Sequence, residues 1–417
     1  MPDREIELMD SPPDGEKLRL HALDNLRAIT MWLGIVLHVA AQHLIGESPF
    51  PWHDSQTSLG ANLLVSFIHS FRMPAFFILA GFFVALLVSR RDFKGMLKHR
   101  MRRVGLPFLI FWPPVFVAVM LVAMLYLHVM AKGSFGLDPG IIPPDTGKPV
   151  INTLHLWFLY YLLWFCVLSA AIGIATRRIP LPIKEGVAEI WRVLAARWWG
   201  FLILALPLAA VGSFYKMGLL MPSGSFIPSP AELIHNGMFF LFGWYLYRNQ
   251  ETLLASYSRY CWRYLFGGGV FYAVFLGTLE HALKAPESMP HAAWLLAYLY
   301  NCVSWLWSIA LIGLFLRHLS KQNAVLRYIS DSSYWVYLVH LIGTIGFGAL
   351  LYKLPLGVFS KISLNVLATT AICLLSYHLL VRFTPLGTLL NGRRFRFKAG
   401  QKKAEELPAQ ERAKQGM

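Results

Sequence analysis

Residues 63–88, LLVSFIHSFRMPAFFILAGFFVALLV, form an apolar run in which His69 and Arg72 are the only ionisable side chains. About 20 apolar residues are enough for a helix to cross a membrane, so this run predicts a transmembrane helix. A charge at that depth is costly, and it usually lines a cavity, pairs with another group or takes part in chemistry. The run therefore indicates a membrane protein with a polar interior site.

Similar apolar runs recur along the whole chain. They predict ten transmembrane helices near residues 27–45, 63–88, 104–128, 154–176, 198–214, 231–247, 264–279, 293–316, 333–352 and 362–382. If the N-terminus is cytoplasmic, the inner loops hold 18 Lys and Arg residues and the outer loops hold 6. This bias follows the positive-inside rule. We therefore predict an all-α polytopic membrane protein, a bundle of about ten helices with both termini cytoplasmic.

The composition agrees with this fold class. The chain of 417 residues is 56% hydrophobic and 14% charged, with a mean hydropathy of +0.50, whereas soluble domains average about 25% charged residues. The net charge of +16 follows membrane orientation, so we expect membrane lipid as a partner and no nucleic acid. The four cysteines show no metal-ligand spacing, so we expect free thiols and no metal.

The chain divides into three predicted parts. Residues 1–22 form a cytoplasmic N-terminal segment without a cleavable signal, residues 23–390 form the transmembrane domain, and residues 391–417 form a basic cytoplasmic tail. The tail has no periodic apolar face, and we expect it to be disordered.

The first predicted helix carries a polar stripe. Arg27, Met31, Gly34 and His38 share one helix face, and His38 lies roughly 16 Å beyond Arg27. A neutral imidazole near mid-membrane can accept a proton from a hydroxyl or a thiol. The alternative is a histidine that only hydrogen-bonds across the bundle.

The second predicted helix places His69 and Arg72 on one face, with Arg72 roughly 13 Å from the outer end. A buried arginine needs a carboxylate, backbone carbonyls, water or an anionic ligand. The alternative is a structural arginine bonded to carbonyls that Pro74 leaves free.

A basic motif precedes the third predicted helix. Arg100, Arg102 and Arg103 lie in an inner loop, where they either set the topology or bind phosphate groups. The phosphates of coenzyme A would fit such a site.

Further polar side chains lie at or near predicted helix ends. His155 and Trp157 open the fourth helix from outside, and Tyr334 and His340 belong to the start of the ninth. These are either substrate contacts or an ordinary aromatic belt. For Glu232 and His235, at an outer helix end, we expect ordinary solvated side chains.

Five motifs, taken in order, resemble those of the membrane acyltransferase 3 family. They are Arg27 and His38 with ten residues between them, within LDNLR at 23–27 and the helix that follows, FIHSFRMPAFF at 67–77, RMRRVGLP at 100–107, HLWFL at 155–159 and YLVH at 337–340. The resemblance implies an O-acyltransferase of the bacterial inner membrane. Such an enzyme moves an acyl group from cytoplasmic acyl-CoA to a periplasmic carbohydrate. The motifs at 69–73 and 155–158 are most similar to family members that succinylate osmoregulated periplasmic glucans, which favours succinyl-CoA as the donor.

This resemblance gives the candidate residues roles. His38 would act as general base toward a sugar hydroxyl or in a covalent transfer step. Arg72 and His69 would stabilise the oxyanion or orient His38, and Arg72 would alternatively bind a succinyl carboxylate. The phosphates of acyl-CoA would contact Arg27, Arg100, Arg102 and Arg103, and the substrates would contact His155, Trp157, Tyr334 and His340.

Another class of protein fits the same buried groups. A proton-coupled transporter or flippase of a glycan or organic anion would use buried histidines and an arginine as its pathway, although no internal repeat is visible. A membrane sensor or scaffold would not need polar groups at this depth. Whether the chain forms a homo-oligomer stays open.

Overall fold

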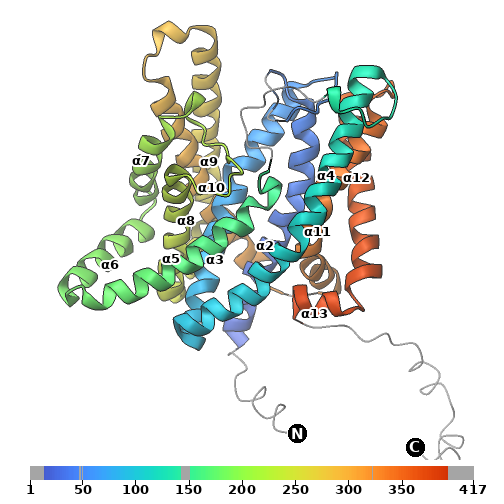
Figure 1. Cartoon of the computed structure of the whole chain (residues 1–417). Helices are drawn as coiled ribbons and strands as arrows, with labels where there is room; N and C mark the ends of the chain where they lie inside the picture. Colours follow the sequence, from blue (N-terminus) through green and yellow to red (C-terminus); the bar gives the residue numbers. More distant parts are fainter. Residues whose placement is uncertain (1–13, 47, 49, 142–150, 322, 393–417) are drawn as a thin grey trace, which may run out of the picture.

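Every regular element of the described structure is helical (Figure 1). The computed structural model describes residues 14–46, 48, 50–141, 151–321 and 323–392. The helices are α2 (Asp14–Ala40), α3 (Leu59–Arg100), α4 (Leu106–Lys132), α5 (Trp157–Ala175), α6 (Leu181–Ala196), α7 (Gly200–Gly212), α8 (Pro230–Arg248), α9 (Gln250–Lys284), α10 (Ala292–His318), α11 (Ala324–Leu351), α12 (Val358–Ser376) and α13 (Pro385–Asn391). Most of the predicted N-terminal segment and tail, residues 1–13 and 393–417, lies outside the described residues.

The long helices pack in two groups on either side of α3 (Figure 1). In one group, α9 and α7 pack against α10, and α8 packs against α3. In the other, α2, α4 and α12 pack against α11. Helices α2, α3 and α10 contact one another and join the two groups. Any side chain on the inner faces of these three helices is therefore held from several directions.

The contact between α3 and α8 depends on two glycines. A Cβ at Gly81 would collide with the Phe240 carbonyl, and a Cβ at Gly243 would collide with the Ile78 carbonyl. The two backbones therefore meet directly, as small residues allow in membrane bundles. This close approach fixes how α8 presents its side chains to α3.

The number of membrane-spanning helices stays a prediction. Each of the ten predicted segments falls largely within a helix of the described structure. By length and composition, however, five helical stretches can cross a membrane, or six if the bent pair α6 and α7 is one span. One of the five is the continuous stretch Leu59–Lys132, which includes both α3 and α4. Helix α7 has only 13 residues, about 20 Å of rise against a hydrocarbon core of about 30 Å.

Segments predicted as inner loops are largely helical, which corrects that part of the prediction. Helix α3 continues to Arg100 through a break at Asp92, where φ is 62°, and the π-helix η2 (Met101–Gly105) leads into α4. The predicted loop near 177–197 contains α6, which meets α7 at 109°. Charged helix ends extend beyond the hydrocarbon because their side chains are solvated there, so a change in hydropathy does not end a helix.

Helix α6 exposes apolar and charged side chains on the same short element. Four apolar side chains of this helix are at least half exposed: Leu181, Ile183, Val187 and Ile190. Glu189 forms an ion pair with Arg192 on the same helix. Figure 1 shows α6 projecting sideways from the helices around α10. These features are those of a helix lying in the interface of a membrane.

Candidate active site

Three histidines from distant parts of the chain converge at one point. His38 lies near the end of α2, His155 lies in the short helix η4 (Leu154–Leu156), and His340 lies in α11. The ring centroids are 5.3 Å apart for His38 and His340, 4.9 Å for His155 and His340, and 6.4 Å for His38 and His155. We call these three side chains the histidine cluster. Phe50 lies against it, 6.0 Å from the His38 ring.

Backbone carbonyls determine which nitrogen carries the proton in two of these rings. His340 Nδ1 lies 2.9 Å from the Tyr337 carbonyl, and His155 Nε2 lies 3.0 Å from the same carbonyl. A carbonyl oxygen only accepts, so both nitrogens must donate. In the neutral rings, His340 Nε2 and His155 Nδ1 then hold lone pairs, and neither has a hydrogen-bond partner among the described residues. The cluster therefore presents buried acceptors that are open to a ligand's proton.

His38 differs from the other two histidines in its exposure. His340 is completely buried and His155 is 7% exposed, whereas His38 is only half-buried. Its Nδ1 is nevertheless buried without a hydrogen-bond partner among the described residues. His38 is therefore the ring of the cluster that a substrate can reach most easily.

A strained turn places His155 in the cluster. Leu154, a non-glycine residue, has a φ of 51°, a conformation that costs about 1–3 kcal/mol. The Asn152 side chain accepts the Leu154 amide at 2.9 Å, and the Thr153 amide donates to the Gly224 carbonyl at 2.8 Å. Strain of this kind is retained where the surrounding contacts enforce it, which is common at functional sites.

Arg72 reaches the cluster through the space left by Gly34. A Cβ at Gly34 would lie 2.5 Å from Arg72 Nη2 and 3.3 Å from His340 Nε2. Arg72 is 6% exposed, and its Nε donates to the Thr30 carbonyl at 3.0 Å. No carboxylate of the described residues forms an ion pair with it. The structure therefore brings a buried guanidinium next to buried imidazoles.

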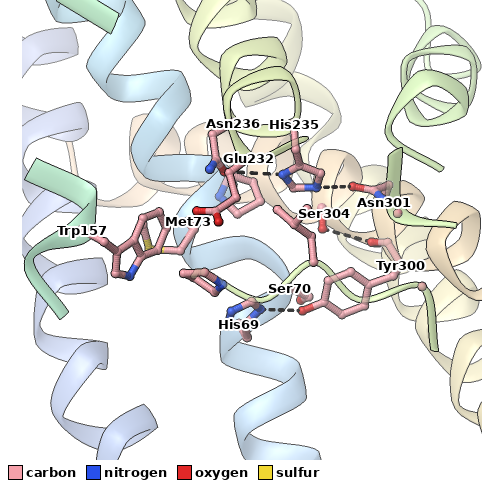
Figure 2. Close-up of a pocket in the computed structure, with 15 residues that line it drawn as sticks. His69, Ser70, Met73, Trp157, Glu232, His235, Asn236, Tyr300, Asn301 and Ser304 are labelled. Carbon is pink, nitrogen blue, oxygen red and sulfur yellow. Dashed lines mark hydrogen bonds between the residues drawn. The ribbon is translucent and has the colours of Figure 1, made fainter. Parts of the chain in front are cut away.

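His69, predicted as part of the same site, lies in a different place. Its Nδ1 shares a hydrogen bond of 3.0 Å with the Tyr300 hydroxyl, in a pocket between α3, α8 and α10 (Figure 2). Trp157 also lines this pocket rather than the histidine cluster. We call it the α8 pocket, and its polar lining is His69, Ser70, Glu232, His235, Asn236, Tyr300, Asn301 and Ser304.

The structure corrects the expectation for Glu232 and His235. Glu232 is only 2% exposed and His235 is half-buried, so neither is an ordinary solvated side chain. The expectation was wrong because the segment before α8 folds back over the helix end: the Ser223 amide donates to Glu232 Oε1 at 3.0 Å. Helix ends near a membrane surface are solvated only where no loop covers them.

The basic residues of the predicted phosphate site separate into different environments. Arg27 and Arg100 lie close enough for their charges to interact, and each has a buried Nε without a partner among the described residues. Arg27 also pairs with Asp24 at 3.3 Å. Two adjacent cations favour a bound anion, so this pair suits a phosphate group.

The two other arginines of the motif, Arg102 and Arg103, lie in different surroundings from the pair of Arg27 and Arg100. Arg103 Nη1 donates to the Thr388 carbonyl at 3.1 Å and to the Leu389 carbonyl at 3.3 Å, near the C-terminal end of α13. Cations at a helix C-terminus stabilise it. Arg102 is exposed. The phosphate-binding role of Arg102 and Arg103 stays a prediction.

The convergence of the three histidines could not be read from their spacing. His155 and His340 lie 185 residues apart, and they were grouped with Trp157 and Tyr334 as substrate contacts. In the structure the Tyr334 hydroxyl is buried without a partner among the described residues. The signal in the sequence was depth: each histidine lies in or beside an apolar run, where an unpaired imidazole is costly.

Among the described residues, no three or more His, Cys, Asp or Glu side chains are placed to hold a metal ion. The ring N–H groups of His155 and His340 already donate to a backbone carbonyl. The remaining nitrogens of these two rings are left to accept hydrogen bonds.

Comparison with known proteins identifies the family. Residues 20–380 match the acyltransferase 3 family model, which is described as an acyltransferase domain. Glucans biosynthesis protein C of Escherichia coli O1:K1 is 26% identical over 345 residues, covering 79% of this chain and 83% of that protein. The protein of the same name from Escherichia coli K12 (DH10B) is 27% identical over 344 residues, with the same shares of each chain. No solved structure matches the chain.

Proposed function

The chain belongs to the acyltransferase 3 family and is a multi-pass membrane O-acyltransferase, and from that premise we propose its substrates and its site. The donor is a cytoplasmic acyl-CoA, with succinyl-CoA favoured, and the acceptor is a hydroxyl of a periplasmic glucan. The membrane is the bacterial inner membrane. The relatives' name supports the glucan. In the alternative role of Arg72, its buried guanidinium would bind a succinyl carboxylate, which supports an acyl group that carries a charge.

The observation that carries the proposal is the convergence of three imidazoles with Arg72. In the proposed reaction, His38 removes the proton from the acceptor hydroxyl as its oxygen attacks the thioester carbonyl carbon. Arg72 stabilises the negative charge that develops on the carbonyl oxygen. The carbon–sulfur bond then breaks, His38 returns the proton to the departing sulfur, and an ester and free coenzyme A result.

His155 and His340 have supporting roles in this proposal. Each donates its N–H to a backbone carbonyl, so the other ring nitrogen of each keeps a lone pair for the protonated form of His38 or for the substrate. A chain of neutral acceptors around a base stabilises the imidazolium that forms after proton transfer. Such stabilisation is large where water is scarce.

On the donor side, Arg27 and Arg100 bind the phosphates of coenzyme A, with Arg102 and Arg103 nearby on η2. Arg103 of η2 contacts α13, whereas His38 lies at the other end of α2 from the N-terminus. Arg27 and His38 are separated by roughly 16 Å of helix. An extended pantetheine arm spans a distance of this order.

The test is transfer of isotope-labelled succinyl from succinyl-CoA to a purified periplasmic glucan by the protein in detergent. We expect a labelled glucan ester, together with slow hydrolysis of the thioester when no glucan is present. Acetyl-CoA in a parallel reaction measures the preference for a charged acyl group. If the protein neither transfers nor hydrolyses any acyl-CoA, and instead moves a glycan or an organic anion across proteoliposomes, the transporter interpretation replaces this one.

A further inference from the structure

The α8 pocket is a second polar site, distinct from the histidine cluster. It encloses about 30 Å³, enough for one or two water-sized groups and too little for a sugar ring. Figure 2 shows the Glu232 carboxylate and the His69 ring facing the space between Trp157 and Tyr300. The lining residues come from α3, α5, α7, α8 and α10 and from the segment before α8, so five helices hold the pocket in shape.

The Glu232 carboxylate is half satisfied. Oε1 accepts the Ser223 amide at 3.0 Å, whereas the buried Oε2 has no hydrogen-bond partner among the described residues. The Tyr161 hydroxyl lies next to the carboxylate and accepts the Ser229 amide at 3.2 Å, so its own proton can turn toward Glu232 or toward a ligand. A buried carboxylate oxygen without a partner is costly. It therefore marks where a ligand with a hydrogen-bond donor belongs.

The rest of the polar lining is fixed by its own hydrogen bonds. Asn301 Nδ2 donates to the Ala297 carbonyl at 2.8 Å, so Asn301 Oδ1 accepts from His235 Nε2 at 3.0 Å. His69 is held by Tyr300. Among the residues that the structure describes, no Lys or Arg side chain lines the pocket. A succinyl carboxylate or a phosphate would meet the Glu232 charge without a compensating cation, so the pocket does not suit the donor.

The pocket nevertheless adjoins the proposed reaction site. His69 precedes Arg72 by one helical turn on α3, and Trp157 follows His155 by two residues. A ligand group in the pocket would therefore belong to a molecule that also reaches Arg72 and His155. The neutral, hydroxyl-bearing substrate is the acceptor.

We propose that the α8 pocket binds one hydroxyl group of the acceptor sugar, adjacent to the hydroxyl that is acylated, with Glu232 Oε2 accepting its hydrogen bond. This inference rests on the proposed function. A single hydroxyl fits the volume, a sugar hydroxyl supplies the missing donor, and the Trp157 ring offers an apolar face to the adjoining carbon atoms. The pocket thus selects the orientation of the acceptor, and Glu232 is a positioning residue.

The experiment compares Glu232→Gln with the unaltered protein, using a glucose oligosaccharide as acceptor and succinyl-CoA as donor. Glutamine keeps the oxygen that accepts the Ser223 amide and replaces the open carboxylate oxygen by a donor. Hydrogen bonds to charged groups are about twice as strong as neutral ones, so we expect the acceptor KM to rise about tenfold. The rate of succinyl-CoA hydrolysis without acceptor should not change. Glu280→Gln, an exposed carboxylate paired with Lys284, is the matched control and should behave like the unaltered protein.

A set of methyl glucosides, each lacking one hydroxyl, sharpens the test. For one of them the unaltered protein should show a raised KM that Glu232→Gln does not raise further. An equal effect of Glu232→Gln on every analogue, an unchanged acceptor KM, or a parallel loss of thioester hydrolysis would each overturn the inference. If Glu232→Gln does not fold, the analogue series on the unaltered protein still decides: equal acceptor KM values for all the analogues would overturn the inference. Failure of the unaltered protein to use succinyl-CoA at all would count against the proposed function itself.

Discussion

The histidine cluster and the buried ion pair between Asp54 and Lys361 are neighbouring polar regions that satisfy their hydrogen bonds differently. Asp54 and Lys361 are each about 2% exposed. Lys361 Nζ donates to Asp54 Oδ2 at 2.8 Å, to Asp54 Oδ1 at 3.1 Å and to the Tyr352 carbonyl at 2.8 Å. All three donors of the ammonium group are therefore used. The histidine cluster, by contrast, leaves a nitrogen open on each ring.

The two regions are connected through the end of α2. The Asp54 amide donates to the Gln42 carbonyl at 2.8 Å, and Gln42 follows His38 by one helical turn. The segment that carries Asp54 also places Phe50 against His38. A saturated ion pair stabilises one conformation of this segment, whereas open acceptors have a use only when a ligand arrives. The proposed function predicts this difference if the ion pair holds the segment in place and the cluster takes part in the reaction.

The largest expected effect separates the two regions by activity. His38→Ala should lower the rate of glucan acylation about 10²- to 10⁴-fold, because a positioned general base contributes that much. The midpoint of thermal unfolding in detergent should change little, since His38 is only half-buried. Acylation is measured by mass spectrometry of the glucan.

The control for this change is His281→Ala, on an exposed histidine near the end of α9. It should leave acylation intact. Normal acylation by His38→Ala would reject the assignment of the base and would make the cluster another structural region.

The next effect separates the regions by stability. Lys361→Met leaves the Asp54 carboxylate buried and unpaired, which should cost about 3–5 kcal/mol of folding free energy. Thermal unfolding in detergent should show the loss, while the acylation rate per folded molecule should stay near normal. The double variant Asp54→Asn with Lys361→Met should recover most of the stability. If the folded single variant lost acylation instead, the ion pair would be part of the reaction site.

The sequence predicted how deep the polar groups lie in the membrane better than it predicted which residues they contact. The positions of His38 and Arg72 followed from apolar run lengths, and the structure brings Arg72 next to Gly34 of the predicted stripe. The partners could not be predicted, because contacts among α2, η4 and α11 depend on tertiary packing. The same limit explains His69, whose neighbour Tyr300 is 231 residues away.

The ends of the helices were the second feature that the sequence did not predict. The hydropathy pattern located the apolar centre of each helix, whereas α3 and α9 continue far into basic segments. Hydropathy reports where a helix can meet lipid, and helix propensity decides where it stops. The covering of Glu232 by residues near Ser223 likewise depends on a loop fold that no periodic pattern records.

A smaller expected effect tests whether the position of Arg72 beside the histidine cluster depends on the space that Gly34 leaves. Gly34→Ala would place a methyl group 2.5 Å from Arg72 Nη2 and 3.3 Å from His340 Nε2, so the guanidinium must shift from its position. A displacement of about 1 Å at a reaction site costs up to about 10²-fold, and we expect kcat to fall 10- to 100-fold. The unfolding midpoint should not fall, because the end of a flexible side chain can shift. Gly269→Ala, in an open position on α9, is the matched control, and equal kcat values for the two variants would contradict the crowding of Arg72.

The smallest expected effect concerns the proposed coenzyme A site. There Arg100 and Arg103 differ in the same way as the two regions above, since one has an open hydrogen-bonding group and the other does not. Arg100 has an unpartnered Nε beside Arg27, whereas Arg103 donates to two carbonyls of α13. Arg100→Gln should therefore raise the KM for succinyl-CoA about tenfold, the size of one charge-assisted hydrogen bond. Arg103→Gln should change this KM less and lower the unfolding midpoint more, because it removes contacts that hold α13. The reverse order would make Arg103 the phosphate ligand, and its contacts with α13 would then have to open when coenzyme A binds.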